Sequence, residues 1–211
     1  DGYTFIPAAT AYNNVTADIA GQDYTAIINT YVISGLVVTD GGAPMNGVVV
    51  NFSGLDAVTT DASGQYSQTV DHGYTGTATP NMAGYTFAPA SIDFTDVTAN
   101  SSNNNFTGTM LTYVISGTVN TDLGDPLVNV DITFSNGGGT VTTDASGMYS
   151  LTVDYGYTGT ATPVLLGYIF DPTFRSYNFV TADMPAMDFT ASEVPPTTYT
   201  ISGTVSEGRT G

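Results

Sequence analysis

The 211-residue chain carries 19 aspartates and glutamates against two arginines, with no lysine and no cysteine, and its formal net charge is −17. Phosphate binding requires clustered cations, so nucleic acid is not an expected partner, and the lack of cysteine excludes disulfides, thiolate metal sites and a cysteine nucleophile. No run of about 18 apolar residues occurs, so no membrane span is expected.

Residues 1–27 have the sequence pattern of the closing part of a repeat. The motif Gly-Tyr-Thr-Phe-Ile-Pro-Ala at 2–8 recurs with small changes at 84–90 and 167–172. The match continues through aromatic and valine positions, which are Tyr12, Phe94 and Tyr177, then Val15, Val97 and Val180. Self-similarity at a fixed period indicates an array of like units. We therefore expect residues 1–27 to be the C-terminal part of a preceding repeat.

Two complete units follow this segment. The block 58–80 returns at 141–163 with three changes, Gln65 to Met148, Gln68 to Leu151 and His72 to Tyr155. A Tyr-x-Ile-Ser-Gly motif opens each unit at Tyr31 and Tyr113 and appears a third time at Tyr199. We expect repeats at 28–110 and 111–193, stacked end to end because the linker is short. Residues 194–211 are expected to be a proline-containing spacer and the first strand of a further repeat.

The apolar pattern inside each unit has a period of two. Inward positions alternate with polar ones at Val48, Val50 and Phe52, and again at Val128, Val130, Ile132 and Phe134. Turn signals such as Asp61-Ala62-Ser63-Gly64 cut each unit into about seven short strands, and no amphipathic helical segment occurs. The fold class predicted is all-β, as tandem seven-stranded antiparallel sandwiches of the Ig-like or prealbumin-like kind.

Four motifs in this order carry a resemblance: Ile-Ser-Gly-x-Val, Pro-x-x-x-Val-x-Val, Thr-Asp-Ala-Ser-Gly-x-Tyr-Ser and Gly-Tyr-x-Gly-x-x-x-Pro. The chain resembles the carboxypeptidase regulatory-like domains and the related B-type repeats of bacterial surface proteins. This resemblance implies prealbumin-like sandwiches that serve as spacers and stalks outside the cell. One departure is the absence of lysine, which excludes both a lysine–asparagine isopeptide crosslink and pilus polymerisation through a lysine.

The sequence has no cysteine or lysine and a single histidine, so the usual pairs of nucleophile and base are scarce and we do not expect an enzyme. His72 is the single histidine, and Tyr155 takes its place in the second unit, so His72 is interpreted as a surface residue beside a turn. The repeated acids Asp61 and Asp144 fall in turns. No cofactor is expected apart from calcium.

Calcium is the candidate metal, because oxygen-rich loops suit Ca²⁺. The candidate ligands near the unit ends are Asp40, Asp93, Asp96, Asp122 and Asp125, with Asn100 beside them. The alternative is that these side chains only shape turns. Recurring aromatics such as Tyr66 and Tyr149 favour core positions, although tyrosines exposed on a sheet could stack on sugars.

The function expected is that of an extracellular, cell-surface structural protein, a segment of a stalk or filament. The alternative is a carbohydrate-binding or adhesive accessory module of a larger secreted protein. The partners expected are copies of the chain or neighbouring repeats, with glycans as further candidates.

Assembly by β-strand donation is the first hypothesis for the ends of the chain. Tyr199, Ile201 and Val205 would be donated to an N-terminal partial unit that contains Tyr3 and Phe5, giving a head-to-tail filament. The stretch corresponding to 118–166 is missing from the composite unit, so the two ends alone cannot rebuild a whole sandwich. The other hypothesis is that the chain is a piece of a longer tandem array.

Overall fold

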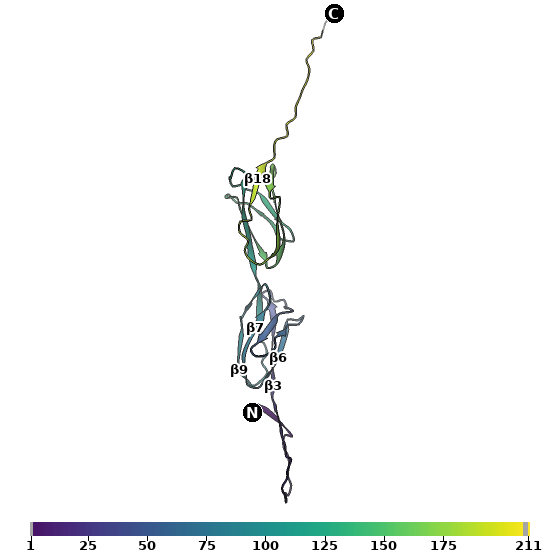
Figure 1. Cartoon of the computed structure of the whole chain (residues 1–211), viewed down its shortest axis with the longest axis vertical. Coiled ribbons are helices and arrows are strands. Elements are labelled where there is room, and N and C mark those ends of the chain that lie inside the picture. The colour runs from purple at the N-terminus through teal and green to yellow at the C-terminus, as the bar shows by residue number, and fades with distance from the viewer. Residues whose placement is uncertain (1, 209–210) are drawn as a thin grey trace. The chain divides into compact units, whose positions relative to one another are not determined.

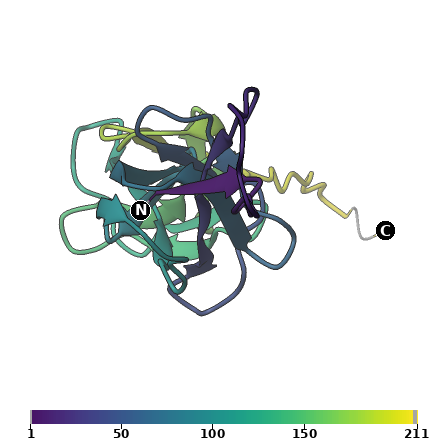
Figure 2. The same ribbon diagram turned by 90° about the horizontal axis from the view of Figure 1, so that it is seen from below.

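The computed structural model describes residues 2–208 and residue 211. Residues 1, 209 and 210, which belong to the predicted segments 1–27 and 194–211, lie outside the described residues. Every regular element in the described part is a β-strand, as Figures 1 and 2 show. The chain divides into two units, 1–111 and 112–211. Within the described part, no helix could cross a membrane.

The first unit contains a sandwich of eight strands. The strands are β3 (Thr30–Thr39), β4 (Val49–Phe52), β5 (Val58–Thr59), β6 (Gln65–Asp71), β7 (Tyr74–Asn81), β8 (Tyr85–Ala88), β9 (Ile92–Val97) and β10 (Phe106–Met110). One sheet has the order β6-β3-β10-β8 and the other β5-β4-β7-β9. All neighbours are antiparallel except β3 and β10, which run parallel.

The second unit repeats this topology strand for strand. Its strands are β11 (Thr112–Thr121), β12 (Asp131–Phe134), β13 (Gly139–Thr142), β14 (Met148–Asp154), β15 (Tyr157–Val164), β16 (Tyr168–Asp171), β17 (Arg175–Val180) and β18 (Phe189–Glu193). The sheets are β14-β11-β18-β16 and β13-β12-β15-β17, and β11 runs parallel to β18.

The core of each sandwich consists of the inward residues of the period-two pattern. In the first unit Ile33, Val37, Val50 and Phe106 are at most 1% exposed, and the second unit buries their counterparts. Two buried threonines close the loop before β4 or β12. The Thr60 hydroxyl donates to the Met45 carbonyl at 2.6 Å and accepts from the Val48 amide, and Thr143 makes the same pair of bonds to Leu127 and Val130.

Residues 2–28 form a two-stranded sheet of β1 (Tyr3–Ile6) and β2 (Thr25–Ile28). Its antiparallel register matches β8 with β10, because Tyr3 lies opposite Ile28 just as Tyr85 lies opposite Met110. The Asn29 amide donates to the Gly2 carbonyl at 2.8 Å, and Leu111 donates to Gly84 in the same way. This hairpin is therefore a third copy of the pair that closes each sandwich.

The all-β prediction is confirmed, and the details differ in three places. Each sandwich has eight strands where seven were predicted, because the short β5 and its counterpart β13 pair with β4 and β12. One strand pair per sandwich is parallel. Val128 was predicted to point inward but is 40% exposed, since Asn129 has a φ of +61° and breaks the alternation there.

Residues 194–208 form no strand, although the motif at Tyr199 predicted one. Their backbone has no hydrogen-bonding partner strand among the described residues, and a β-strand is defined by its pairing. The assembly residues Tyr199, Ile201 and Val205 are accordingly 86–104% exposed.

Candidate functional site

The first strand of the first sandwich is held against the segment that ends it. The backbone amide of Ser34 donates to the Ser101 carbonyl at 2.9 Å, and Ser101 donates to the Val32 carbonyl at 2.9 Å. Further along, Phe106 lies opposite Val37 in the parallel ladder. We call this pairing of β3 with residues 100–108 the terminal clamp. It joins the two strands through which the chain enters and leaves the sandwich.

Two asparagine side chains complete the clamp where the backbone bulges away. The Asn100 carbonyl oxygen Oδ1 accepts from the Val32 amide at 2.9 Å, and Asn105 Oδ1 accepts from the Leu36 amide at 2.8 Å. A free amide on a strand would otherwise be left without a partner. These side chains extend the ladder over most of β3.

The second unit has the same clamp with carboxylates as acceptors. Asp183 Oδ1 accepts from the Val114 amide at 2.8 Å, and Asp188 Oδ1 accepts from the Thr118 amide at 2.7 Å. A charged acceptor makes the stronger bond. Both acceptor positions are thus occupied by a short side chain with an acceptor oxygen, Asn in the first unit and Asp in the second.

The glycine of the Ile-Ser-Gly motif is explained by this close approach. A Cβ on Gly35 would overlap the Asn104 carbonyl oxygen and lie 2.6 Å from the Asn104 carbonyl carbon. A Cβ on Gly117 would lie 2.6 Å from the Met187 carbonyl carbon. Only glycine lets the two backbones meet at this point.

A buried tyrosine fixes the same bulge from the side. The Tyr66 hydroxyl donates to the Asn104 carbonyl at 2.5 Å, and the Tyr149 hydroxyl donates to the Met187 carbonyl. Burial raises the pKa of Tyr66 to about 12, because the phenolate would lose its hydration. Burial also raises the pKa of Tyr149, and the nearby Tyr177 adds to the effect. The hydroxyls therefore act as hydrogen-bond donors.

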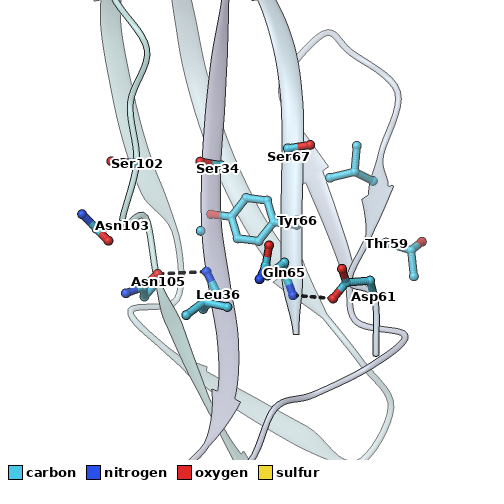
Figure 3. A pocket seen from close by; sticks show the side chains of 12 residues that line it. Ser34, Leu36, Thr59, Asp61, Gln65, Tyr66, Ser67, Ser102, Asn103 and Asn105 are labelled. Carbon is cyan, nitrogen blue, oxygen red and sulfur yellow. Dashed lines mark hydrogen bonds between the residues drawn. The ribbon is translucent and has the colours of Figure 1, made fainter. Parts of the chain in front are cut away.

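A polar groove lies along the clamp of the first unit, with a volume of about 680 Å³. Figure 3 shows Asn103 and Asn105 on one side of β3, and Thr59 and Asp61 beyond β6 on the other. Gln65 lies between them, and its backbone N–H donates to Asp61 Oδ1 at 2.9 Å. The lining offers hydroxyls and amides with one carboxylate and no cation, which suits a neutral polar ligand.

The equivalent positions of the second unit have a different chemistry. Gln65, Asn103 and Asn105 correspond to Met148, Ala186 and Asp188. Arg175 also reaches into this region, where its Nε donates to the Asp188 carbonyl at 2.9 Å and its guanidinium lies over the Phe189 ring. The amide-lined groove is therefore a feature of the first unit.

The five calcium candidates do not gather at one site. Asp40 follows β3, Asp93 and Asp96 lie on β9, and all three are exposed. Asp122 and Asp125 line a cleft of about 500 Å³ in the second unit with Glu193. Over residues 2–208 and residue 211, no group of three or more His, Asp or Glu side chains is placed to hold a metal ion. Calcium binding stays a prediction.

The other residues singled out in the sequence, Tyr3, Phe5 and His72, lie on or beside the N-terminal hairpin. Tyr3 and Phe5 lie on β1 and are 55% and 51% exposed. His72 is half-buried rather than a free surface residue, because its ring packs against Gly2 and lies edge-on to Tyr31 at 5.9 Å between centroids. Its amide donates to the Asn29 carbonyl at 2.8 Å, so it belongs to the junction between the hairpin and the sandwich.

Sequence reasoning missed the clamp acceptors Asn105, Asp183 and Asp188, and it grouped Asn100 with the candidate calcium ligands. The signal was present in the repeat register, since Asn100 and Asp183, and Asn105 and Asp188, occupy equivalent positions. The recurrence of Asn or Asp at both positions in both units is the pattern by which the clamp acceptors could have been predicted.

Comparison with known proteins gives one sequence relative and a set of similar folds. No family model matches the chain. It is 34% identical over 210 residues to the chitinase ChiA of Flavobacterium johnsoniae, which covers 90% of this chain. The chain spans only 13% of the length of that relative.

Among solved structures, the Bacillus anthracis TIE protein matches with a TM-score of 0.64 at 14% identity, over 82% of this chain and 37% of that one. The minor pilin of Streptococcus agalactiae matches with a TM-score of 0.38 at 10% identity, over 82% of this chain and all of that one. The likeness to the TIE protein shows the β-sandwich fold alone.

Proposed function

We propose that this chain is a tandem β-sandwich spacer, a non-enzymatic segment of a larger extracellular protein that works as part of a surface stalk or filament. Association of copies by strand donation is the proposed mode of assembly. The observation that carries the proposal is the parallel terminal clamp, present in both sandwiches with the same acceptor positions.

A parallel pairing of first and last strands has a mechanical consequence. Because β3 and β10 run in the same direction side by side, the chain enters the sandwich at one end and leaves it at the other. Tension applied at Thr30 and Met110 pulls the two strands past each other, so the hydrogen bonds of the clamp resist together rather than one after another. A spacer under tension requires this property.

The passage between repeats supports the same role. One residue, Leu111, separates β10 from β11, and one residue, Asn29, separates β2 from β3. Short connections transmit tension directly and leave little chain to extend. The match to part of a much longer relative supports the proposal that the sandwiches serve within a larger protein.

Single-molecule pulling in two directions tests the proposal. Because the chain has no native cysteine, a pair of cysteines can be introduced as attachment points for pulling. One pair replaces Asn29 and Leu111, and the other replaces Thr69 and Thr86 on the two edge strands β6 and β8. We expect the first sandwich to resist a higher force between 29 and 111 than between 69 and 86, where edge strands peel away. Equal forces in the two directions would contradict a mechanical role of the clamp.

A second candidate function is the binding of a neutral glycan in the groove of Figure 3. The amide and hydroxyl lining favours it, and the name of the chitinase relative makes oligomers of N-acetylglucosamine the first probe. An aromatic platform is lacking in the groove, since Tyr66 is only 4% exposed, so binding would be weak.

A titration followed by NMR tests this second function. The probe is the tetrasaccharide of N-acetylglucosamine at millimolar concentration. Gln65→Met with Asn103→Ala installs the residues of the second unit and should abolish the chemical-shift changes that this probe causes. Asn178→Ala removes an exposed amide outside the groove and should leave the shifts unchanged. No shifts in the unmodified chain would exclude the binding of this probe.

A further inference from the structure

The bulge of the terminal clamp is closed by different side chains in the two sandwiches. In the first, Nδ2 of Asn104 donates to the Ser101 hydroxyl oxygen and to the Ser34 carbonyl, both at 3.1 Å. In the second, the positions of Ser101 and Asn104 are occupied by Met184 and Met187. A polar pair in the first bulge is thus replaced by a pair of thioethers in the second.

The backbone of these two methionines forms part of the second clamp. Met184 accepts from the Ser116 amide at 3.0 Å and donates to the Val114 carbonyl at 2.8 Å. Met187 donates to the Ser116 carbonyl at 3.0 Å, and its own carbonyl accepts from the Tyr149 hydroxyl. These hydrogen bonds hold only while residues 184–187 stay against β11.

The side chains of the two methionines serve as apolar packing. Both pack against the buried cluster of the second sandwich, whose members Ile115, Tyr149 and Phe189 are at most 3% exposed. Both are also partly exposed, unlike Met45 of the first sandwich, which is 6% exposed. A small solute can therefore reach side chains on which the second clamp depends.

We propose that Met184 and Met187 form an oxidation site, at which a hydroperoxide converts the thioethers to sulfoxides and thereby loosens the terminal clamp of the second sandwich. The sulfur lone pair attacks one peroxide oxygen, so that an S–O bond forms as the O–O bond breaks. With hydrogen peroxide, the released hydroxide takes the proton of the transferred oxygen and leaves as water. The sulfur is oxidised and the peroxide is reduced, so no further reactant is required.

Oxidation changes what the two side chains can pack against. A sulfoxide is polar, and its oxygen accepts hydrogen bonds that an apolar core does not supply. The oxidised side chains must therefore turn away from the cluster toward solvent, and the backbone at 184–187 moves with them. Because the bonds from the Ser116 amide and the Tyr149 hydroxyl end on this backbone, they should weaken together.

The other methionines should respond differently to the same oxidant. Met110 and Met148 are 40% and 52% exposed, so a sulfoxide at either position keeps its hydration and disturbs little. In the first sandwich, Met45 is buried and Met82 lies next to Gly47 rather than in the bulge. The first clamp should consequently survive a treatment that loosens the second.

Native-state hydrogen exchange on the full chain tests the site. The Ser116 amide is the reporter, and the Ser34 amide, which donates to the Ser101 carbonyl at 2.9 Å, is its counterpart in the first clamp. After treatment with hydrogen peroxide, with the sulfoxides located by mass spectrometry, Ser116 should exchange about tenfold faster while Ser34 keeps its rate. The readout involves no tension, so its failure would leave the proposed spacer function untouched.

Two double variants identify the sulfurs responsible. Met184→Leu with Met187→Leu keeps apolar side chains of similar volume, so it should fold and should make the Ser116 rate insensitive to peroxide. Met110→Leu with Met148→Leu removes the exposed thioethers and should leave the response intact. Equal acceleration in the Met184→Leu, Met187→Leu chain would overturn the proposal.

The unmodified chain supplies a test that needs no variant. Methionine sulfoxide reductase applied to the oxidised chain should restore the slow exchange of Ser116. An unchanged Ser116 rate in a chain oxidised at Met184 and Met187 would overturn the proposal. So would fast exchange that persists after both sulfoxides are reduced, or a lack of sulfoxide at both positions when Met110 and Met148 are oxidised.

Discussion

Substitution of Gly35 by alanine is the sharpest perturbation of the terminal clamp. The added methyl group would overlap the Asn104 carbonyl oxygen and lie 3.0 Å from Cε1 of Tyr66. Neither neighbour is a flexible chain end, since one is backbone and the other is a ring whose hydroxyl is already bonded to that carbonyl. The segment 101–105 must therefore move away from β3.

The cost can be estimated from what this movement breaks. Overpacking in a tight site destabilises by about 1–3 kcal/mol, and each lost hydrogen bond adds about 1 kcal/mol. The Tyr66–Asn104 and Leu36–Asn105 bonds are both at risk. We expect Gly35→Ala to lower the free energy of unfolding of the first sandwich by about 3–5 kcal/mol.

Urea denaturation followed by far-UV circular dichroism measures this loss on the full chain. Gly203→Ala is the matched control, because it changes the glycine of the same motif where nothing lies within 4 Å. It should leave both unfolding transitions unchanged. A Gly35→Ala chain within 0.5 kcal/mol of the unmodified protein would refute the close-approach explanation, since ordinary surface substitutions fall within about that range.

Three further outcomes follow from the same contacts. Thr60→Val leaves the Val48 amide and the Met45 carbonyl without partners and should destabilise the first sandwich by about 2–4 kcal/mol in a thermal melt, with Thr143→Val doing the same in the second. Asn105→Ala removes only the acceptor of the Leu36 amide and should cost about 1–2 kcal/mol in urea. Burial raises the pKa of folded Tyr66 from 10.0 to about 12, so its contribution to the free energy of unfolding is complete below pH 10 and is lost as pH rises toward 12. Tyr66→Phe should therefore flatten the profile of unfolding free energy against pH between pH 10 and 12. An unchanged slope in that range would contradict this role of Tyr66.

The strand pattern was predictable because burial imposes a period of two. Val50, Phe52, Ile132 and Phe134 are buried as the alternation requires, and the Asp-Ala-Ser-Gly turns form with Asp61 and Asp144 accepting forward amides at 2.8–2.9 Å. The repeat predicted residues 1–27 to be the closing part of a preceding unit, and the β1–β2 pair found there has the register of β8–β10.

The clamp was not predictable by the same reasoning. Its acceptors sit in irregular backbone with a positive φ at Asn103 or Ala186, where no periodic pattern applies. Side chains that replace backbone acceptors are chosen by position rather than by hydrophobicity, so Asn100 resembled a calcium ligand. The parallel pairing of β3 with β10 joins residues about 70 apart, and single-sequence patterns carry no information about such pairs.

The most direct test of the central claim is end-to-end pulling of the chain with and without the clamp acceptors of one sandwich. The unmodified protein should show two unfolding events of similar length, each on the order of 250 Å for a repeat of this size. Asn100→Ala with Asn105→Ala should lower the force of one event and leave the other unchanged, while Asn51→Ala, which removes an exposed amide from β4, should alter neither. If the double variant unfolds at the same two forces as the unmodified chain, the terminal clamp does not hold the sandwich under tension.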